Sequence, residues 1–268
     1  MKIEKNESLA EMKKRKVREL LLMPIICEKN GDKKIVIKKE NQIIITSQQY
    51  YSTADEDMSD FAVEFYKILY GENLLKDKEL LNNGTLVNKE LAGDTMNSFN
   101  TIANLFSPYS YRWDGENQIV SVNPYLLNYK ARYHCLANFW LIPMRHGRMS
   151  AKRVKNGKET YDSPVLYMES IQEKWSSLSE ESVITYRNDE NKYKNFFTML
   201  KSDVFSEVHC FPSCINGVDL RKKYEDKNGL DLVKESLGFI IKRADKICEN
   251  SNIVEKLYSR FKDLKLLD

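Results

Sequence analysis

Apolar residues recur at intervals of three and four along most of the chain, which is the spacing of one buried helix face. This spacing predicts helices over residues 8–22, 55–70, 93–106, 124–142, 163–175, 191–200, 230–248 and 253–266. The segment 124–142 begins at a proline, and apolar residues surround most of its helical circumference. We therefore expect it to be a central helix and the most buried element, with Leu136 and Trp140 inside.

The sequence contains fewer patterns typical of strands than of helices. Two β-branched runs, at residues 34–37 and 43–47, flank a polar turn and predict a hairpin. Residues 119–122 predict a further short strand. Together these patterns indicate an α+β, mainly α-helical fold, with a helical core and a small antiparallel sheet built from the hairpin and that strand. No repeat or domain boundary is evident, so we expect a single globular domain over residues 1–268.

Two segments of the chain are strongly basic. The first is an N-terminal basic helix within residues 1–25, which opens with a Ser8–Glu11 capping box. The second is the stretch 147–162, which has little periodicity and is predicted to be a mobile basic loop. A run of Lys and Arg on a helix is most often a solvated face, and we interpret the first segment in that way.

Composition narrows the class of protein. Hydrophobic residues make up 42% of the chain, with only 10 Gly and 6 Pro, which favours a large helical core over a turn-rich β sandwich. The 42 basic and 39 acidic residues leave a net charge of +3. A dedicated duplex-DNA binder normally has a larger excess, so any contact with nucleic acid must come from a local patch.

The compartment is inferred from cysteine usage and hydropathy. The five cysteines are an odd number, the first residues lack the apolar stretch of a secretory signal, and no run of about 18 apolar residues occurs. These features predict a cytoplasmic protein with no membrane contact. The abundance of Lys, Asn and Ile is typical of an AT-rich bacterial or phage genome.

One candidate metal site lies at His209, Cys210 and Cys214. Structural zinc normally needs a second pair of ligands at close spacing, which is missing here. Buried cysteines that bind nothing are the commoner alternative. We therefore expect neither a metal nor a cofactor, and a zinc-stabilised fold remains the less favoured alternative.

A second candidate lies on the predicted central helix. His134 and Asn138 are four residues apart and would share a helix face, with Lys130 one turn earlier. A polar stripe on a central helix must find partners. Those partners are either other side chains, such as Asn97 and Asn104, or a ligand, and the structural network is the commoner outcome.

The third candidate is the tract Arg145-His146-Gly147-Arg148. Arginine offers forked donors that fit phosphate, glycine lets the backbone approach closely, and histidine can transfer protons near neutral pH. Lys152 and Arg153 extend the positive charge. The alternative is an exposed basic loop that binds nothing.

The motifs Gly-Asp-Thr-Met-Asn-Ser-Phe at 93–99 and Leu-Ala-Asn-Phe-Trp-Leu-Ile-Pro-Met-x-x-Gly-Arg at 136–148 give a resemblance to an uncharacterised bacterial family. Proteins of that family resemble products of bacterial defence or mobile-element neighbourhoods. The resemblance assigns no catalytic residue. It does imply that Asp94, Asn97, Asn138 and Arg148 face one common cleft.

The sequence thus predicts a phosphate-directed protein of bacterial defence or mobile-element conflict, which binds RNA or a nucleotide. A metal-independent phosphodiesterase or ribonuclease is one form of this hypothesis. Its catalytic residues would be His146, His134 and Arg148, with binding by Arg145, Asn138, Asp94, Asn97, Lys152 and Arg153. The alternative is a non-catalytic interaction or sensor module with a protein partner, so enzymatic activity itself stays open.

Overall fold

The computed structural model describes residues 7–28, 36–46, 56–71, 91–96, 111–113, 119–121, 124–143, 154–156, 159–161, 209–210 and 229–267. The helices are α1 (Leu9–Leu21), α2 (Asp60–Tyr70), α4 (Pro124–Lys130), α10 (Gly229–Ile247) and α11 (Ser251–Asp263), with short 3₁₀ turns η1 (Glu56–Met58) and η4 (Leu136–Asn138). The strands are β1 (Ile25–Glu28), β2 (Val36–Lys39), β3 (Gln42–Thr46), β4 (Leu91–Thr95), β5 (Tyr111–Trp113), β6 (Ile119–Ser121), β7 (Phe139–Pro143), β8 (Val154–Asn156) and β9 (Glu159–Tyr161). Within these residues the fold is α+β and mainly helical, as the sequence predicts.

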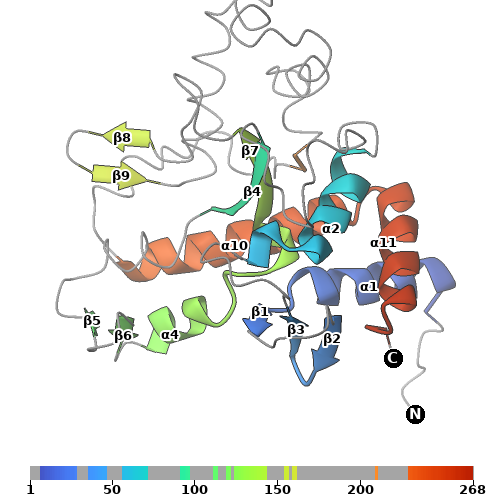
Figure 1. Cartoon of the computed structure of the whole chain (residues 1–268), viewed down its shortest axis with the longest axis horizontal. Helices are drawn as coiled ribbons and strands as arrows, with labels where there is room; N and C mark the ends of the chain where they lie inside the picture. Colours follow the sequence, from blue (N-terminus) through green and yellow to red (C-terminus); the bar gives the residue numbers. More distant parts are fainter. Residues whose placement is uncertain are drawn as a thin grey trace, which may run out of the picture.

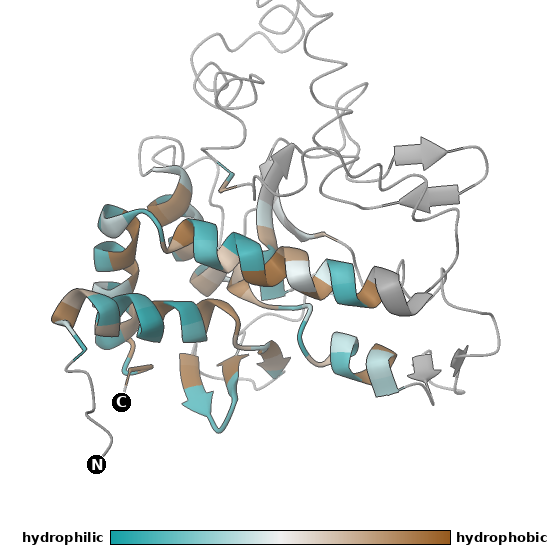
Figure 2. Ribbon diagram, turned by 180° about the vertical axis from the view of Figure 1, so that it is seen from behind, coloured by the Kyte–Doolittle hydropathy of each residue, from teal (hydrophilic) through white to brown (hydrophobic). Residues whose placement is uncertain are grey.

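The helices are arranged around α10, which runs through the middle of the described fold (Figure 1). Helix α11 packs against α1 and α2, while α10 contacts α1, η4 and α4. Helices α1 and α10 carry both apolar and polar residues along their length, and Figure 2 shows the two kinds alternating. Their apolar faces meet in one core, to which Leu21, Phe65, Trp140 and Phe261 contribute. The predicted helices at 8–22, 55–70, 230–248 and 253–266 are confirmed, with small shifts at their ends.

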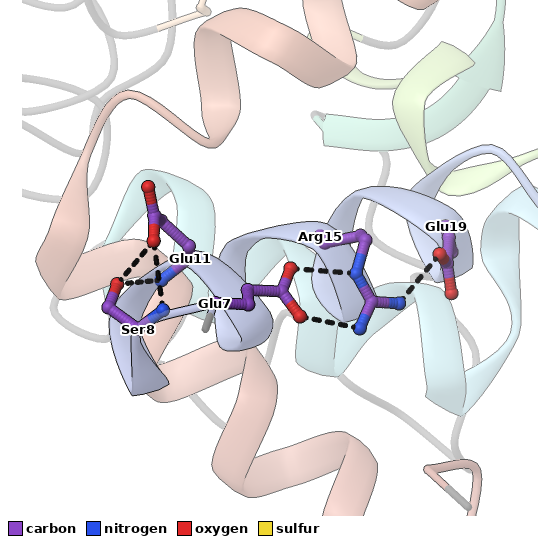
Figure 3. A network of polar contacts seen from close by, with 5 residues as sticks. All are labelled: Glu7, Ser8, Glu11, Arg15 and Glu19. Atoms are coloured by element: carbon purple, nitrogen blue, oxygen red, sulfur yellow. Dashed lines mark hydrogen bonds and ion pairs between the residues drawn. The ribbon is translucent and has the colours of Figure 1, made fainter. Parts of the chain in front are cut away.

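The N-terminal helix α1 forms as its capping residues predict. The Ser8 side chain accepts a hydrogen bond from Glu11 N, and the Glu11 carboxylate accepts one from Ser8 N (Figure 3). Its basic residues form ion pairs: Lys13 with Glu255, Arg15 with Glu7 and Glu19, and Arg18 with Asp245. Much of the positive charge of this helix is therefore neutralised within the fold.

The small sheet is mixed, with strand order β1-β3-β2. The predicted hairpin is confirmed, because β2 and β3 pair antiparallel with Ile37 opposite Ile44. The third strand is not residues 119–122. It is β1, which pairs parallel to β3, while β6 pairs with β5 in a separate two-stranded sheet. The prediction that residues 119–122 form the third strand of this sheet is therefore wrong.

The predicted helix at 124–142 is also wrong beyond its first two turns. Helix α4 ends at Lys130, and after a turn and η4 the chain enters strand β7. The partner of β7 is β4, which lies where the sequence predicted the start of the 93–106 helix, with Asp94 opposite Trp140. The predicted burial is nevertheless confirmed, because Leu136 and Trp140 are both fully buried.

The remaining predictions concern segments that the structure describes only in part or not at all. The stretch 147–162, expected to be an irregular loop, contains the antiparallel strands β8 and β9, with Val154 opposite Tyr161. The loop prediction is therefore wrong at those strands. The predicted helices at 163–175 and 191–200, and the rest of the 93–106 segment, lie outside the described residues.

Candidate functional site

Arg243 is the polar centre of the core. It lies on α10, is fully buried, and its Cζ sits 3.7 Å from the centre of the Trp140 ring. Nη1 donates to the carbonyl oxygens of Ala137 and Phe139, both at 2.8 Å, and Nε donates to that of His209. Nη2 has no hydrogen-bond partner among the described residues. Arg243 thereby fixes the backbone of η4 and the start of β7 to α10.

His209 belongs to the same buried centre. Its Nδ1 lies 3.1 Å from Tyr70 Oη, and its ring stacks on Trp140. Burial, helped by the nearby Arg243 charge, lowers the pKa of His209 to about 3, so the imidazole is neutral in the fold. Cys210 is buried beside it, and Cys214 lies outside the described residues. No group of three metal-ligating side chains occurs within the part of the chain that is described.

A second buried polar group joins η1 to β4. Thr95 Oγ1 donates to Asp57 Oδ2 at 2.6 Å, and Tyr66 Oη donates to the Asp57 carbonyl oxygen at 2.9 Å. Gly93 passes against this carbonyl so closely that a Cβ there would overlap it. We interpret these contacts as structural, because Asp57, Tyr66 and Thr95 are all buried.

The neighbouring residue, Glu56, forms a different kind of contact. Its Oε2 lies 3.2 Å from His134 Nδ1, and its Oε1 accepts a hydrogen bond from Cys27 N at 3.1 Å. The side chains of His134 and Glu56 are 20% and 21% exposed, so the pair reaches the surface. A carboxylate at Nδ1 fixes the orientation and tautomer of an imidazole and stabilises its protonated form. The pair is therefore suited to proton transfer.

The backbone around His134 is firmly held. Its carbonyl oxygen accepts a hydrogen bond from Ile25 N at 2.8 Å, so the residue is attached to the edge of β1. The His134 ring lies edge-on to Phe139 and 4.5 Å from the Tyr133 ring. An acid–base group must keep its position during reaction, and these contacts provide that rigidity.

Asn138 does not share a helix face with His134, because α4 has ended before either residue is reached. The Asn138 side chain is buried and its amide nitrogen donates to the carbonyl oxygens of Met96 and Tyr133, at 2.8 and 2.9 Å. Both donors of the amide are thereby used by the backbone. Asn138 thus holds the Tyr133–His134 turn in place and is not exposed to a ligand.

Two basic side chains lie near His134 on the surface. Lys130, which ends α4, and Arg132, in the turn that follows, are both exposed. Arg132 makes no ion pair within the described residues. Both side chains are therefore exposed within four residues of the imidazole along the chain.

The remaining predicted site residues are distributed as follows. Asp94 lies in β4, where it is paired with Trp140. Arg145, His146, Arg148, Lys152, Arg153 and Asn97 lie outside the described residues. The common cleft expected from the resemblance stays a prediction, although Asn138 is enclosed.

Sequence reasoning missed two residues. Glu56 was overlooked because a carboxylate at the start of a helix resembles an ordinary capping residue, and nothing local links it to His134. Arg243 was overlooked because it lies in an amphipathic helix where arginine is normally exposed. Strand β1, which holds the His134 carbonyl, was also missed, but the sequence does contain a signal for it. Pro24 is followed there by the β-branched pair Ile25-Ile26, which favours a strand.

No helix in the described ranges is both long and apolar enough to cross a membrane. No protein-family model matches the chain, and neither a curated protein nor a solved structure matches it. The chemistry of its own residues is therefore the basis for assigning a function.

Proposed function

We propose that this chain binds a phosphate-bearing ligand, RNA or a nucleotide, and cleaves RNA without a metal ion. The observation that carries the proposal is the partly exposed Glu56–His134 pair, with a contact of 3.2 Å, beside the exposed Lys130 and Arg132. An oriented imidazole next to cationic side chains is the arrangement that general acid–base cleavage of a phosphodiester requires.

The distribution of charge supports a phosphate ligand. The whole chain carries only +3, yet residues 117–158 contain no Asp or Glu at all. The basic residues of that stretch are Lys130, Arg132, Arg145, Arg148, Lys152, Arg153, Lys155 and Lys158. The side chains of this stretch therefore carry positive charge and no negative charge, which favours an anionic ligand, while a carboxylate beside His134 comes from Glu56 of η1.

Each side chain has a defined role in the proposed reaction. The ribose 2′-oxygen attacks phosphorus as a base removes its proton, and the 5′-oxygen leaves as an acid protonates it, giving a 2′,3′-cyclic phosphate. His134, oriented by Glu56, is one of these two groups, and His146 is the other. Arg145 and Arg148 bind the phosphate oxygens, where their forked donors stabilise the added negative charge. Lys152 and Arg153 extend the contact along the ligand.

The biological setting belongs to the same proposal. The family resemblance at 93–99 and 136–148 favours a protein of bacterial defence or mobile-element conflict, and the cysteine usage favours a cytoplasmic one. Degradation of RNA is a reaction that such a protein can use without a cofactor. A protein partner that controls access to the site is compatible with this setting.

The proposal is tested by incubating the purified protein with end-labelled RNA in the presence of EDTA. We expect cleavage products that end in a cyclic phosphate, and loss of at least about 100-fold in rate in His134→Gln, since a positioned acid–base group contributes about 10²–10⁴-fold. Lys256→Gln, on the exposed side of α11, is the control and should cleave normally. Arg148→Lys should weaken RNA binding with little change in the melting temperature, because it keeps the charge and loses the fork.

Two results would contradict the proposal. One is cleavage that His134→Gln leaves unchanged, which would remove the proposed proton-transfer group. The other is a wild-type protein that neither binds nor alters RNA or any nucleotide. That outcome would favour the alternative of a non-catalytic interaction or sensor module.

A further inference from the structure

Three tyrosines follow one another at intervals of four along α4 and its exit. They are Tyr125, Tyr129 and Tyr133. The helical hydrogen-bond pattern continues past the end of α4, because Tyr133 N donates to the Tyr129 carbonyl oxygen at 3.0 Å. Side chains at this interval lie one above another on a single face. The tyrosines therefore follow one face of α4 and its exit toward His134, and we call them the tyrosine stripe.

Burial varies along the tyrosine stripe. Tyr129 is fully buried and anchors the stripe in the core, and the Tyr133 ring stacks on it with centroids 5.8 Å apart. Tyr133 is half-buried and contacts the His134 ring. At the other end, Tyr125 is 48% exposed. Aromatic surface is thus open to solvent on both sides of one fixed ring.

Positive charge accompanies this surface. Lys130 and Arg132 are exposed between Tyr129 and His134, and no carboxylate occurs from residue 117 to 158. Exposed aromatic rings close to cations match a ligand whose planar bases can stack on the rings and whose phosphates can bind the cations. In Figure 1, α4 lies at the opposite end of the described fold from α11, so this surface is separate from the ion-paired face of α1.

We propose that the surface formed by Tyr125, Lys130, Arg132 and Tyr133 binds unpaired, single-stranded RNA. The inference rests on the proposed function and names its substrate class. Bases stack on Tyr125 and on the accessible part of Tyr133, while Lys130 and Arg132 contact the backbone phosphates. A base on Tyr133 brings its own phosphodiester to the neighbouring His134.

A single strand fits this surface better than a duplex does. In a duplex the base faces are already stacked on one another, and an A-form helix presents sugars and phosphates instead. Exposed aromatic rings would contribute nothing to such a ligand. Stacking on tyrosine also tolerates any base, so we expect little sequence preference.

The experiment measures fluorescence anisotropy with a labelled single-stranded RNA of about 12 nucleotides, a typical site size. Its sugars carry 2′-O-methyl groups, so it cannot be cleaved by 2′-oxygen attack. The matching duplex and a mononucleotide are titrated in parallel. We expect the single strand to bind more tightly than the duplex, and Tyr125→Ala to weaken binding about fivefold or more, because stacking contributes about 1–3 kcal/mol per base. Tyr125→Phe keeps the ring and should bind like the wild type.

The charged residues are tested by the salt dependence of binding. In the double variant Lys130→Gln/Arg132→Gln, the slope of log affinity against log salt should fall by about 1.4, at about 0.7 for each phosphate contact of a single strand. The charge-matched control, Lys256→Gln/Lys262→Gln on α11, should leave the slope unchanged. Tyr125 and both cations are exposed, so these variants should fold, and circular dichroism verifies that they do.

The outcomes separate this inference from the function on which it rests. Equal binding of duplex and single strand, or normal binding by Tyr125→Ala, would overturn the inference and leave a phosphate-directed protein. Binding of the mononucleotide alone would do the same. If the wild type bound none of the three ligands, the proposed function would fall and the inference with it.

Discussion

Gly93 shows how a single residue determines a contact between elements. It lies in β4, and a Cβ at this position would be 2.6 Å from Tyr66 Oη and would overlap the Asp57 carbonyl oxygen. That carbonyl is already fixed by its hydrogen bond from Tyr66. Neither neighbour can move without breaking the bond, so only glycine fits.

We therefore predict that Gly93→Ala lowers the free energy of unfolding by about 1–3 kcal/mol, the usual cost of overpacking. Gly238→Ala is the matched control. Gly238 lies within α10 with open space around it, so the added methyl group should stabilise the helix by about 0.5–1 kcal/mol. Urea unfolding of both variants measures the difference. Equal effects in the two variants would show that β4 does not approach η1 so closely.

His209 gives stability a dependence on pH. Its pKa is about 3 in the fold and 6.5 ordinarily, so between these values the unfolded chain binds a proton that the native state excludes. Stability is therefore complete above the ordinary value and is lost as the pH falls through this window. The bonds from Ser8 lower the pKa of the Glu11 carboxyl, so its contribution to stability is complete above its ordinary value of 4.5 and is lost only as the pH falls below that value.

We predict that the free energy of unfolding falls between pH 6.5 and pH 4.5, by at most about 1.4 kcal/mol per pH unit from this one group. His209→Gln retains a polar group for Tyr70 but cannot titrate, so its curve should be flatter. Urea unfolding at several pH values measures both proteins. Parallel curves would mean that His209 is accessible to protons in the native state.

At the scale of the element, η4 and β7 depend on a distant arginine. An apolar run such as residues 136–142 has no period that separates a buried helix from a buried strand. In a helix the carbonyl oxygens of Ala137 and Phe139 would bind amides four residues later. Here Arg243 binds both, and β4 pairs with the strand that follows. Neither Arg243 nor β4 lies near this segment in the sequence, so the local pattern alone predicts a helix.

We predict that Arg243→Met and Arg243→Lys each lower the free energy of unfolding by about 3–5 kcal/mol, because buried carbonyl oxygens lose their donor and lysine lacks the fork. Lys242→Met, at the exposed neighbouring position, should change it by less than about 0.5 kcal/mol. Hydrogen exchange should show faster opening of β7 in the Arg243 variants. A stable Arg243→Met protein with protected β7 amides would refute this role.

The amphipathic helices could be predicted because the signals that specify them are local in the sequence. In α1, α2, α10 and α11 the apolar spacing and the capping residues are local, and Ser8 and Ser59 bind amides within their own first turn. The same holds for the β2–β3 hairpin. The parallel strand β1 and the β4–β7 pair join segments far apart in sequence, and no local pattern specifies such partners.

In the molecule as a whole, the candidate site lies beside the core and joins two parts of the fold. Glu56 lies in η1, just before α2, while His134 follows α4 and contacts the buried Phe139. Helices α1, α2 and α11 pack together at one end, and α4 lies at the other (Figure 1). His134 could be selected as a candidate from the sequence, because its residue type and its basic neighbours are visible there, and its role stays a prediction. Its partner Glu56 could not be selected in this way, since the pair exists only after η1 has been brought against the turn that follows α4.

RNA is proposed to bind beside His134, and the three histidines of the chain allow a direct test. The protein is labelled with ¹³C in its histidine rings, and non-cleavable single-stranded RNA is titrated while the ring resonances are recorded. Single His→Gln variants assign the three signals. We predict that the His134 signal shifts with saturation, while that of the enclosed His209 stays fixed. An unmoved His134 signal with RNA fully bound would show that RNA binds elsewhere on the protein.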